Sequence, residues 1–118
     1  MQDSVTNMIN DVVFVRDTAT AFQVALEMLR HNRHQIPVVD SEQNLIGIIS
    51  VDDLYSAEND GIKSLIKEPE LVIPDDVSTY EAVSRMKAAN AICGLVTRGS
   101  KLAGMFTWRD LLSEFTHR

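Results

Sequence analysis

Leu45-Ile46-Gly47-Ile48-Ile49-Ser50-Val51-Asp52-Asp53-Leu54 is the stretch that decides the fold, because it returns as Leu102-Ala103-Gly104-Met105-Phe106-Thr107-Trp108-Arg109-Asp110-Leu111, 57 residues later. The same ungapped shift pairs Ile9 with Ile66, Val15 with Val72, Ala25 with Ala82 and Val39 with Val96. These matches fall on apolar and motif positions. A two-copy repeat of this length predicts two similar units, each too small to bury a good core alone. We therefore expect the halves to pack about an approximate two-fold axis, with function between them.

Outward from this stretch, the first copy has the order β-α-β-β-α. Strands are predicted at 12–15, 35–39 and 45–50, with a helix at 21–32 and a second helix from about residue 51. Phe22, Ala25, Leu26 and Leu29 recur at the spacing of an amphipathic helix. Thr20 with Gln23 has the capping-box pattern that starts such a helix.

The second copy repeats this order. Strands are predicted at 71–73, 92–97 and 102–107, a turn at 74–76, and helices at 79–89 and from 108 through 115. The capping pair of Ser78 and Glu81 lies one residue out of register with the first copy. Segments 5–9 and 62–66 are predicted to form single helical turns, and 56–61 a polar joint. The two halves, 1–57 and 58–118, would together form one globular module.

Composition narrows the class of protein. The chain has 118 residues, 45% of them hydrophobic and 24% charged, which is ordinary for a single globular domain. A net charge of −6 with scattered basic residues disfavours a nucleic-acid partner. No apolar run is long enough for membrane insertion, and the start of the chain does not resemble a secretory signal. The single cysteine, Cys93, suits a reducing compartment, so a cytoplasmic location is expected.

Two motifs on the repeat carry a resemblance to a known family. Ile36-Pro37-Val38-Val39-Asp40 is followed by Gly47-Ile48-Ile49-Ser50-x-x-Asp53, and the doubled pattern resembles a tandem pair of CBS domains, also called a Bateman module. The likeness covers nearly the whole chain. The ungapped register places Gly94 opposite Pro37 and Thr97 opposite Asp40, as departures in the second copy. The resemblance implies an α/β (α+β) fold of two β-α-β-β-α repeats related by pseudo-two-fold symmetry and packed through their sheets.

Each copy carries a Ser/Thr-x-x-Asp pair at the start of its last helix. A carboxylate there can accept both hydroxyls of a ribose, while the Ser or Thr hydroxyl serves a phosphate. The same spacing is also a plain capping box, and the two roles can coexist. The family resemblance implies that Ser50 with Asp53, and Thr107 with Asp110, contact the ribose and phosphate of an adenosine ligand.

Residues at the entry to the middle strand separate the two copies. His34 and Gln35 are polar, whereas the ungapped register places Ala91 and Ile92 at the same point of the second copy. The first copy is therefore the better predicted site. The predicted ligand-binding residues are Ser50, Asp53, His34, Gln35, Ile36, Pro37 and Val13 in the first copy, with apolar members walling an adenine slot, and Thr107, Asp110 and Arg109 in the second.

The leading functional hypothesis is a regulatory, energy-sensing module without catalytic activity. Its ligand would be AMP, ADP, ATP or an S-adenosyl compound, with or without Mg²⁺, and no obligatory cofactor is expected. The resemblance implies a homodimer that passes ligand occupancy to a fused or separate effector domain. A ligand-free dimerisation or docking module with decayed sites is the alternative. An enzyme is disfavoured because no nucleophile has an adjacent base, and His31, His34 and His117 lack the spacing of a metal site.

Overall fold

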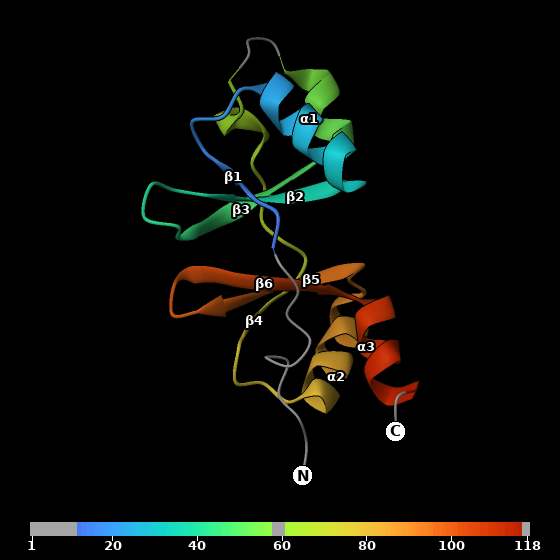
Figure 1. The fold of residues 1–118 in the computed structure, drawn as a ribbon. Coiled ribbons are helices and arrows are strands. Elements are labelled where there is room, and N and C mark those ends of the chain that lie inside the picture. Colours follow the sequence, from blue (N-terminus) through green and yellow to red (C-terminus); the bar gives the residue numbers. More distant parts are fainter. Residues whose placement is uncertain (1–11, 58–60, 117–118) are drawn as a thin grey trace. The chain divides into compact units, whose positions relative to one another are not determined.

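The computed structural model describes residues 12–57 and 61–116 of the chain. It divides into two compact units, one of residues Val13–Glu68 and one that begins at Pro69 (Figure 1). Each unit has the predicted order of strand, helix, strand, strand and helix, so the mixed α/β class is confirmed. Within the described residues, no helix is both long and apolar enough to cross a membrane.

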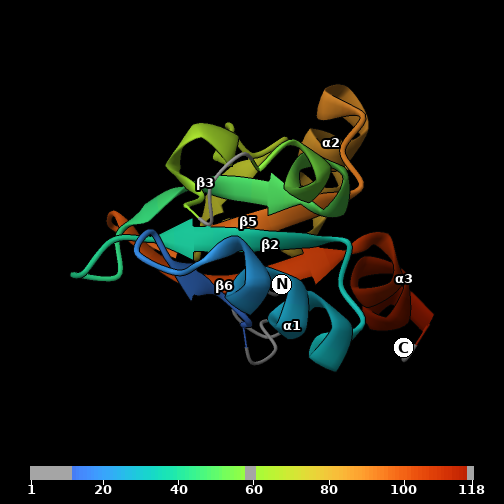
Figure 2. The same cartoon turned by 90° about the horizontal axis from the view of Figure 1, so that it is seen from above.

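The first unit is a three-stranded sheet with helices on one face. Its elements are β1 (Val15–Arg16), α1 (Ala21–His31), β2 (Gln35–Val39), β3 (Leu45–Ser50) and two 3₁₀ helices, η2 (Val51–Ser56) and η3 (Lys63–Leu65). β2 lies in the middle, parallel to β1 and antiparallel to β3 (Figure 2). The capping box of Thr20 and Gln23 at the start of α1 is confirmed, with bonds of 2.9 and 3.1 Å.

The second unit repeats this arrangement. It consists of β4 (Val72–Pro74), α2 (Thr79–Ala89), β5 (Cys93–Arg98), β6 (Lys101–Thr107) and α3 (Trp108–Thr116). β5 is parallel to β4 and antiparallel to β6. Ser78 Oγ accepts the Glu81 N–H at 3.1 Å and so caps α2 as predicted. Both units have the same order of elements, because the hydrophobic periodicity changes from that of a strand to that of a helix at matching positions of the two repeats.

Several predicted boundaries are wrong by a few residues. Residues 12–14 precede β1 instead of belonging to it, because the parallel pairing starts where Val15 meets Val38. Pro74, predicted in a turn, ends β4, an edge strand on which a missing N–H is tolerated. The helix predicted from residue 51 is a 3₁₀ helix. The turn at 62–66 contains η3, whereas the one predicted at 5–9 lies outside the described residues.

The helix α1 carries two apolar faces. Val24 and Met28 are the buried residues that face the sheet. Phe22 and Leu29, which recur with Leu26 at helical spacing, are 66% and 79% exposed. Three apolar residues on the outward face satisfied the same helical spacing as the true core positions. These residues leave an apolar surface on the first unit.

The ungapped shift of 57 is also wrong for the first half of each repeat. The helices α1 and α2 begin 58 residues apart, at Ala21 and Thr79, and their left-handed capping residues Asn32 and Asn90 are also 58 apart. The strand pairing agrees, since Val15 with Val38 corresponds to Ile73 with Val96. After the hairpin, β3 and β6 return to the shift of 57. The hairpin of the second unit is one residue shorter and turns at Gly99, which has a φ of 65°.

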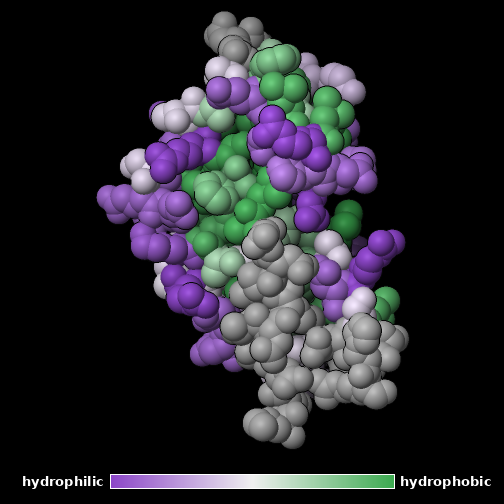
Figure 3. Space-filling model, in the orientation of Figure 1, coloured by the Kyte–Doolittle hydropathy of each residue, from purple (hydrophilic) through white to green (hydrophobic). Residues whose placement is uncertain are grey.

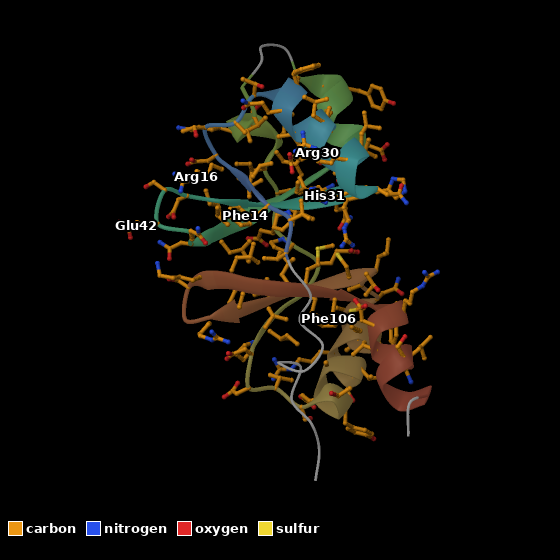
Figure 4. The ribbon with its side chains drawn as sticks, viewed as in Figure 1. Phe14, Arg16, Arg30, His31, Glu42 and Phe106 are labelled. Carbon is orange, nitrogen blue, oxygen red and sulfur yellow. The ribbon has the colours of Figure 1, made fainter. Side chains whose placement is uncertain are left out.

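This corrected register changes the meaning of Gly94. Its counterpart is Ile36, not Pro37, and the counterparts of Pro37 and Asp40 are Leu95 and Arg98. Ile36 pairs across the strands with Ile49, and Gly94 pairs with Phe106. A Cβ on Gly94 would collide with the Phe106 ring, which is 1% exposed and lies on the helix side of its sheet (Figure 4). One unit thus fills this part of its core with two isoleucines and the other with a glycine and a phenylalanine.

Candidate functional site

The Ser50-x-x-Asp53 pair sits where β3 ends and η2 begins. The Asp53 Oδ2 atom accepts hydrogen bonds from the Ser50 N–H at 3.0 Å and from the Ser50 hydroxyl at 2.9 Å. The Asp53 side chain is 29% exposed. Its carboxylate is therefore held in one orientation by its own turn while it still reaches solvent.

Lys67 is a third partner of this carboxylate. Its Nζ atom lies 3.3 Å from Asp53 Oδ2, and its side chain is 51% exposed. Within residues 12–57 and 61–116, the hydrogen bonds and the ion pair of the Asp53 carboxylate all fall on Oδ2. The other oxygen, Oδ1, remains available for a ligand. A carboxylate has about four lone-pair sites, so the existing contacts do not exhaust it.

The backbone of Lys67 is fixed against β3. The Lys67 N–H donates to Ile48 O and the Ile48 N–H donates to Lys67 O, each at 2.9 Å. This close approach needs Gly47, since a Cβ there would lie 2.5 Å from Lys67 O and 2.6 Å from the Ile66 side chain. Ile62 and Leu65, just before Lys67, are buried in the core of the first unit. The sequence register had assigned this segment to the second repeat.

The environment of Asp53 favours its ionised form. The hydrogen bond from the Ser50 backbone N–H is the main cause of a lowered Asp53 pKa, and partial burial opposes it. The Ser50 hydroxyl and the Lys67 ammonium lower the pKa further. The carboxylate is therefore a charged acceptor over the whole physiological pH range.

The second unit builds the same turn with a shorter backbone bond and a longer hydroxyl contact. Asp110 Oδ2 accepts the Thr107 N–H at 2.8 Å, whereas the Thr107 hydroxyl is 3.3 Å away. Thr107 Oγ1 in turn accepts the Asp110 N–H at 3.4 Å. Arg109, predicted as a source of positive charge, is exposed on α3. The neighbouring Trp108 is half-buried and donates from Nε1 to Ala91 O at 3.1 Å.

The remaining residues predicted for the first site lie at different depths. Gln35 is the direct cross-strand neighbour of Ser50, so the sheet brings it to the same end. Ile36 and Pro37 are buried, and Ile36 belongs to the core of its unit. Val13 is half-buried and packs on that core. The adenine slot that these residues were predicted to wall stays a prediction.

His34 lies at a pocket of about 460 Å³ between α1 and η2. Its lining residues are Ala25, Met28, Leu29, Asn32, Arg33, His34, Val51, Leu54 and Tyr55. Ser50 and Asp53 do not line this pocket, although the Val51 N–H donates to His34 O at 2.8 Å. His34 and Arg33 thus line the same pocket. In the second unit the corrected register replaces His34 by Ile92, which is 68% exposed.

Metal ligands do not gather anywhere in the described part of the chain. Among residues 12–57 and 61–116, no three His, Cys, Asp or Glu side chains lie close enough to hold an ion. Cys93 is buried in β5.

The chain has two β-α-β-β-α units, and each unit has a Ser/Thr-x-x-Asp turn after its last strand. These features define a class of repeat modules in which both repeats carry a carboxylate at the same position. The chain belongs to the CBS domain family. The family model for the CBS domain matches it twice, over residues 3–60 and 62–117.

Known relatives and solved structures agree with this membership. A CBS domain-containing protein of Dictyostelium discoideum is 31% identical over 95% of this chain and 90% of its own length. The CBS domain of a bacterial CNNM/CorC family Mg²⁺ transporter, solved in complex with ATP, is 18% identical, with a TM-score of 0.80 over 97% of this chain and 87% of its own. CBSX2 in complex with AMP is 15% identical, with a TM-score of 0.84 over 98% and 97%.

Proposed function

We propose that this chain is a non-catalytic regulatory module that binds an adenosine-containing ligand of the AMP, ADP or ATP type at Ser50 and Asp53. The observation that carries the proposal is the Asp53 carboxylate, ionised, oriented through Oδ2 and open at Oδ1. The vicinal hydroxyls of a ribose are two adjacent donors, which one carboxylate can accept together. The AMP and ATP complexes of CBSX2 and the transporter domain support the ligand class.

The first unit is the stronger of the two candidate sites. Ser50 has a short hydroxyl contact to its aspartate, Gln35 lies beside it, and Lys67 supplies positive charge. In the second unit the hydroxyl contact is longer, and exposed Ile92 replaces a histidine. Ligand bound at the first site would change the function of a dimer partner or attached domain through unequal affinity for two conformations.

Calorimetric titration of nucleotide-stripped protein tests the proposal. AMP, ADP, ATP and S-adenosylmethionine are titrated with and without Mg²⁺. We expect saturable binding of one ligand and a loss of roughly five- to a hundredfold in affinity in Asp53→Ala, the range for a charge-assisted hydrogen-bond pair. Asp52→Ala removes an exposed carboxylate from the same helix and is the matched control. Equal affinity in Asp53→Ala and the wild type would show that the turn only caps η2.

A ligand-free dimerisation module is the second candidate, and the apolar outward face of α1 favours it. Tyr55 of η2 is 88% exposed and lines a pocket together with Leu29, Phe22 of α1 is 66% exposed, and apolar side chains reach the surface over these helices (Figure 3). Exposed apolar side chains in such a group are typical of an interface. A second copy of the chain is the occupant that a homodimer would supply. If no nucleotide binds in the calorimetric titration and the protein is a stable dimer, this candidate is favoured.

A further inference from the structure

Resting on the proposed adenosine site, we infer that Lys67 selects phosphorylated adenosine ligands over uncharged nucleosides and over the cationic S-adenosylmethionine. Lys67 lies outside the Ser50-x-x-Asp53 motif and reaches it only through the fold. It would act as a counter-ion for Asp53 when the site is empty and as a partner for phosphate when it is filled.

The first step of the argument is the local charge. The chain has a net charge of −6, and a lone Asp53 would repel the phosphate of any nucleotide whose ribose it binds. Among the described residues, Lys67 is the cation within ion-pair distance of that carboxylate, at 3.3 Å. It brings the pair to a net charge of zero. The repulsion between the site and a phosphate is removed at the point where the ribose would dock.

The second step is the position of the lysine. Its backbone is fixed by the two 2.9 Å bonds to Ile48, while half of its side chain is exposed to solvent. A fixed base with a flexible four-carbon stem lets the ammonium leave Oδ2 and follow a nearby anion. A ribose whose second hydroxyl also reaches Oδ2 would compete with Lys67 there and release it. The phosphate on the same sugar is then the nearest acceptor.

The third step is discrimination by charge. An uncharged nucleoside whose two ribose hydroxyls use both carboxylate oxygens must displace Lys67 from Oδ2 without giving it a new partner, so its binding is weakened. S-adenosylmethionine places a sulfonium cation on the same sugar carbon that carries the phosphate in AMP, and Lys67 would repel it. The favoured ligand class is therefore the adenine nucleotides.

Calorimetry with adenosine, AMP and S-adenosylmethionine at fixed ionic strength tests this inference. We expect wild-type protein to bind AMP most tightly. Lys67→Met should weaken AMP roughly tenfold, as for loss of a hydrogen bond to a charged group, and leave adenosine equal or tighter. Lys67→Arg should keep most of the preference. Lys63→Met removes an exposed lysine of η3 from the same segment and should change neither affinity.

The possible outcomes separate this inference from the proposed function. If Lys67→Met weakens AMP and adenosine equally, or weakens neither, Lys67 has no role in selection although the adenosine site stands. If the wild type binds none of the three ligands, the adenosine site is wrong and this inference falls with it. A carboxyl NMR titration gives an independent check, because Lys67→Met should raise the Asp53 pKa if the ion pair exists. Circular dichroism confirms that each variant is folded.

Discussion

The Asp53 carboxylate has a structural role, and the proposed ligand site adds a recognition role at the same side chain. Its Oδ2 atom closes the turn between β3 and η2 through hydrogen bonds with Ser50. The same atom forms an ion pair with Lys67. Capping and ligand binding were the two interpretations of the sequence motif, and the geometry makes them compatible. The capping bonds use one oxygen and leave the other.

This arrangement predicts a defined pH dependence of stability. The pKa of Asp53 is lower in the folded chain than its ordinary value of about 3.9, so its contribution to folding is complete above that value. That contribution is lost as the pH falls through the lower folded-state pKa. The urea midpoint of the wild type should therefore exceed that of Asp53→Asn by a constant amount from pH 5 to 7. The difference should shrink below about pH 4.

Asp52→Asn is the control for this measurement, because Asp52 is exposed on the same 3₁₀ helix. Its midpoint should follow that of the wild type at every pH. A difference between the wild type and Asp53→Asn that persists unchanged to pH 2.5 would contradict the assignment of the lowered pKa to the contacts with Ser50 and Lys67.

At this scale the sequence predicts local contacts and misses distant ones. Ser50 and Asp53 were predicted because three residues separate them and the contact closes within one turn. Lys67 was missed because its contact depends on the antiparallel bridge to Ile48, and only the adjacent Gly47 hints at the close approach. His34 was predicted from its neighbours in the chain; it lines the pocket between α1 and η2, and its role in ligand binding stays a prediction.

At the scale of elements, the two units solve one packing problem in two ways. Ile36 with Ile49 and Gly94 with Phe106 occupy equivalent cross-strand pairs in the corrected register. Ile36, Ile49 and Phe106 are at most 1% exposed. The loss of a side chain at Gly94 is balanced by the larger ring opposite to it. Gly94 is therefore a packing residue, and it is not a sign that the second site has decayed.

A double-mutant cycle tests this exchange of volume. Gly94→Ile alone forces a side chain into the Phe106 ring, and Phe106→Ile alone leaves a cavity, so each should lower the free energy of unfolding by about 1–3 kcal/mol. The double variant recreates the isoleucine pair of the first unit. Its loss should be smaller than the sum of the single losses by at least about 0.5 kcal/mol. Chemical denaturation measures all four proteins.

The control pair is Gly61→Ile with Phe106→Ile. Gly61 has open space around its missing Cβ, so these two changes should be additive. Additivity at Gly94 and Phe106 as well would show that the backbone, and not the volume of the two side chains, decides the cost there.

The order of the elements was predicted in full from the periodicity, but their register was not. The match between β3 and β6 dominated the comparison because those strands share a glycine and a Ser/Thr-x-x-Asp motif. A hairpin that is one residue shorter shifts everything before it by one position. Apolar residues are so frequent in the first half of each repeat that both shifts pair apolar with apolar. The capping residues Thr20 and Ser78 signalled the true shift, and so did identities such as Met28 with Met86 and Asn32 with Asn90.

At the scale of the whole molecule, the apolar outward face of α1 predicts self-association. Leu29→Glu places a charge in the group of Phe22, Leu29 and Tyr55, and should convert a dimer to a monomer at micromolar concentration. Light scattering coupled to size exclusion gives the mass of each species. Lys63→Glu, an exposed charge change on η3, should leave the mass unchanged. A wild-type monomer at high concentration would contradict the prediction.

The chain that crosses from one repeat to the next completes the first unit, and this affects the order in which the protein can fold during synthesis. Ile62, Leu65 and the strand-like bond of Lys67 to Ile48 all lie beyond residue 57, where the sequence repeat would place the end of the first unit. A ribosome that has released 57 residues has therefore not yet released a complete core. The sequence repeat and the folded unit therefore end at different residues. Fragments designed to isolate the first fold should end after Glu68.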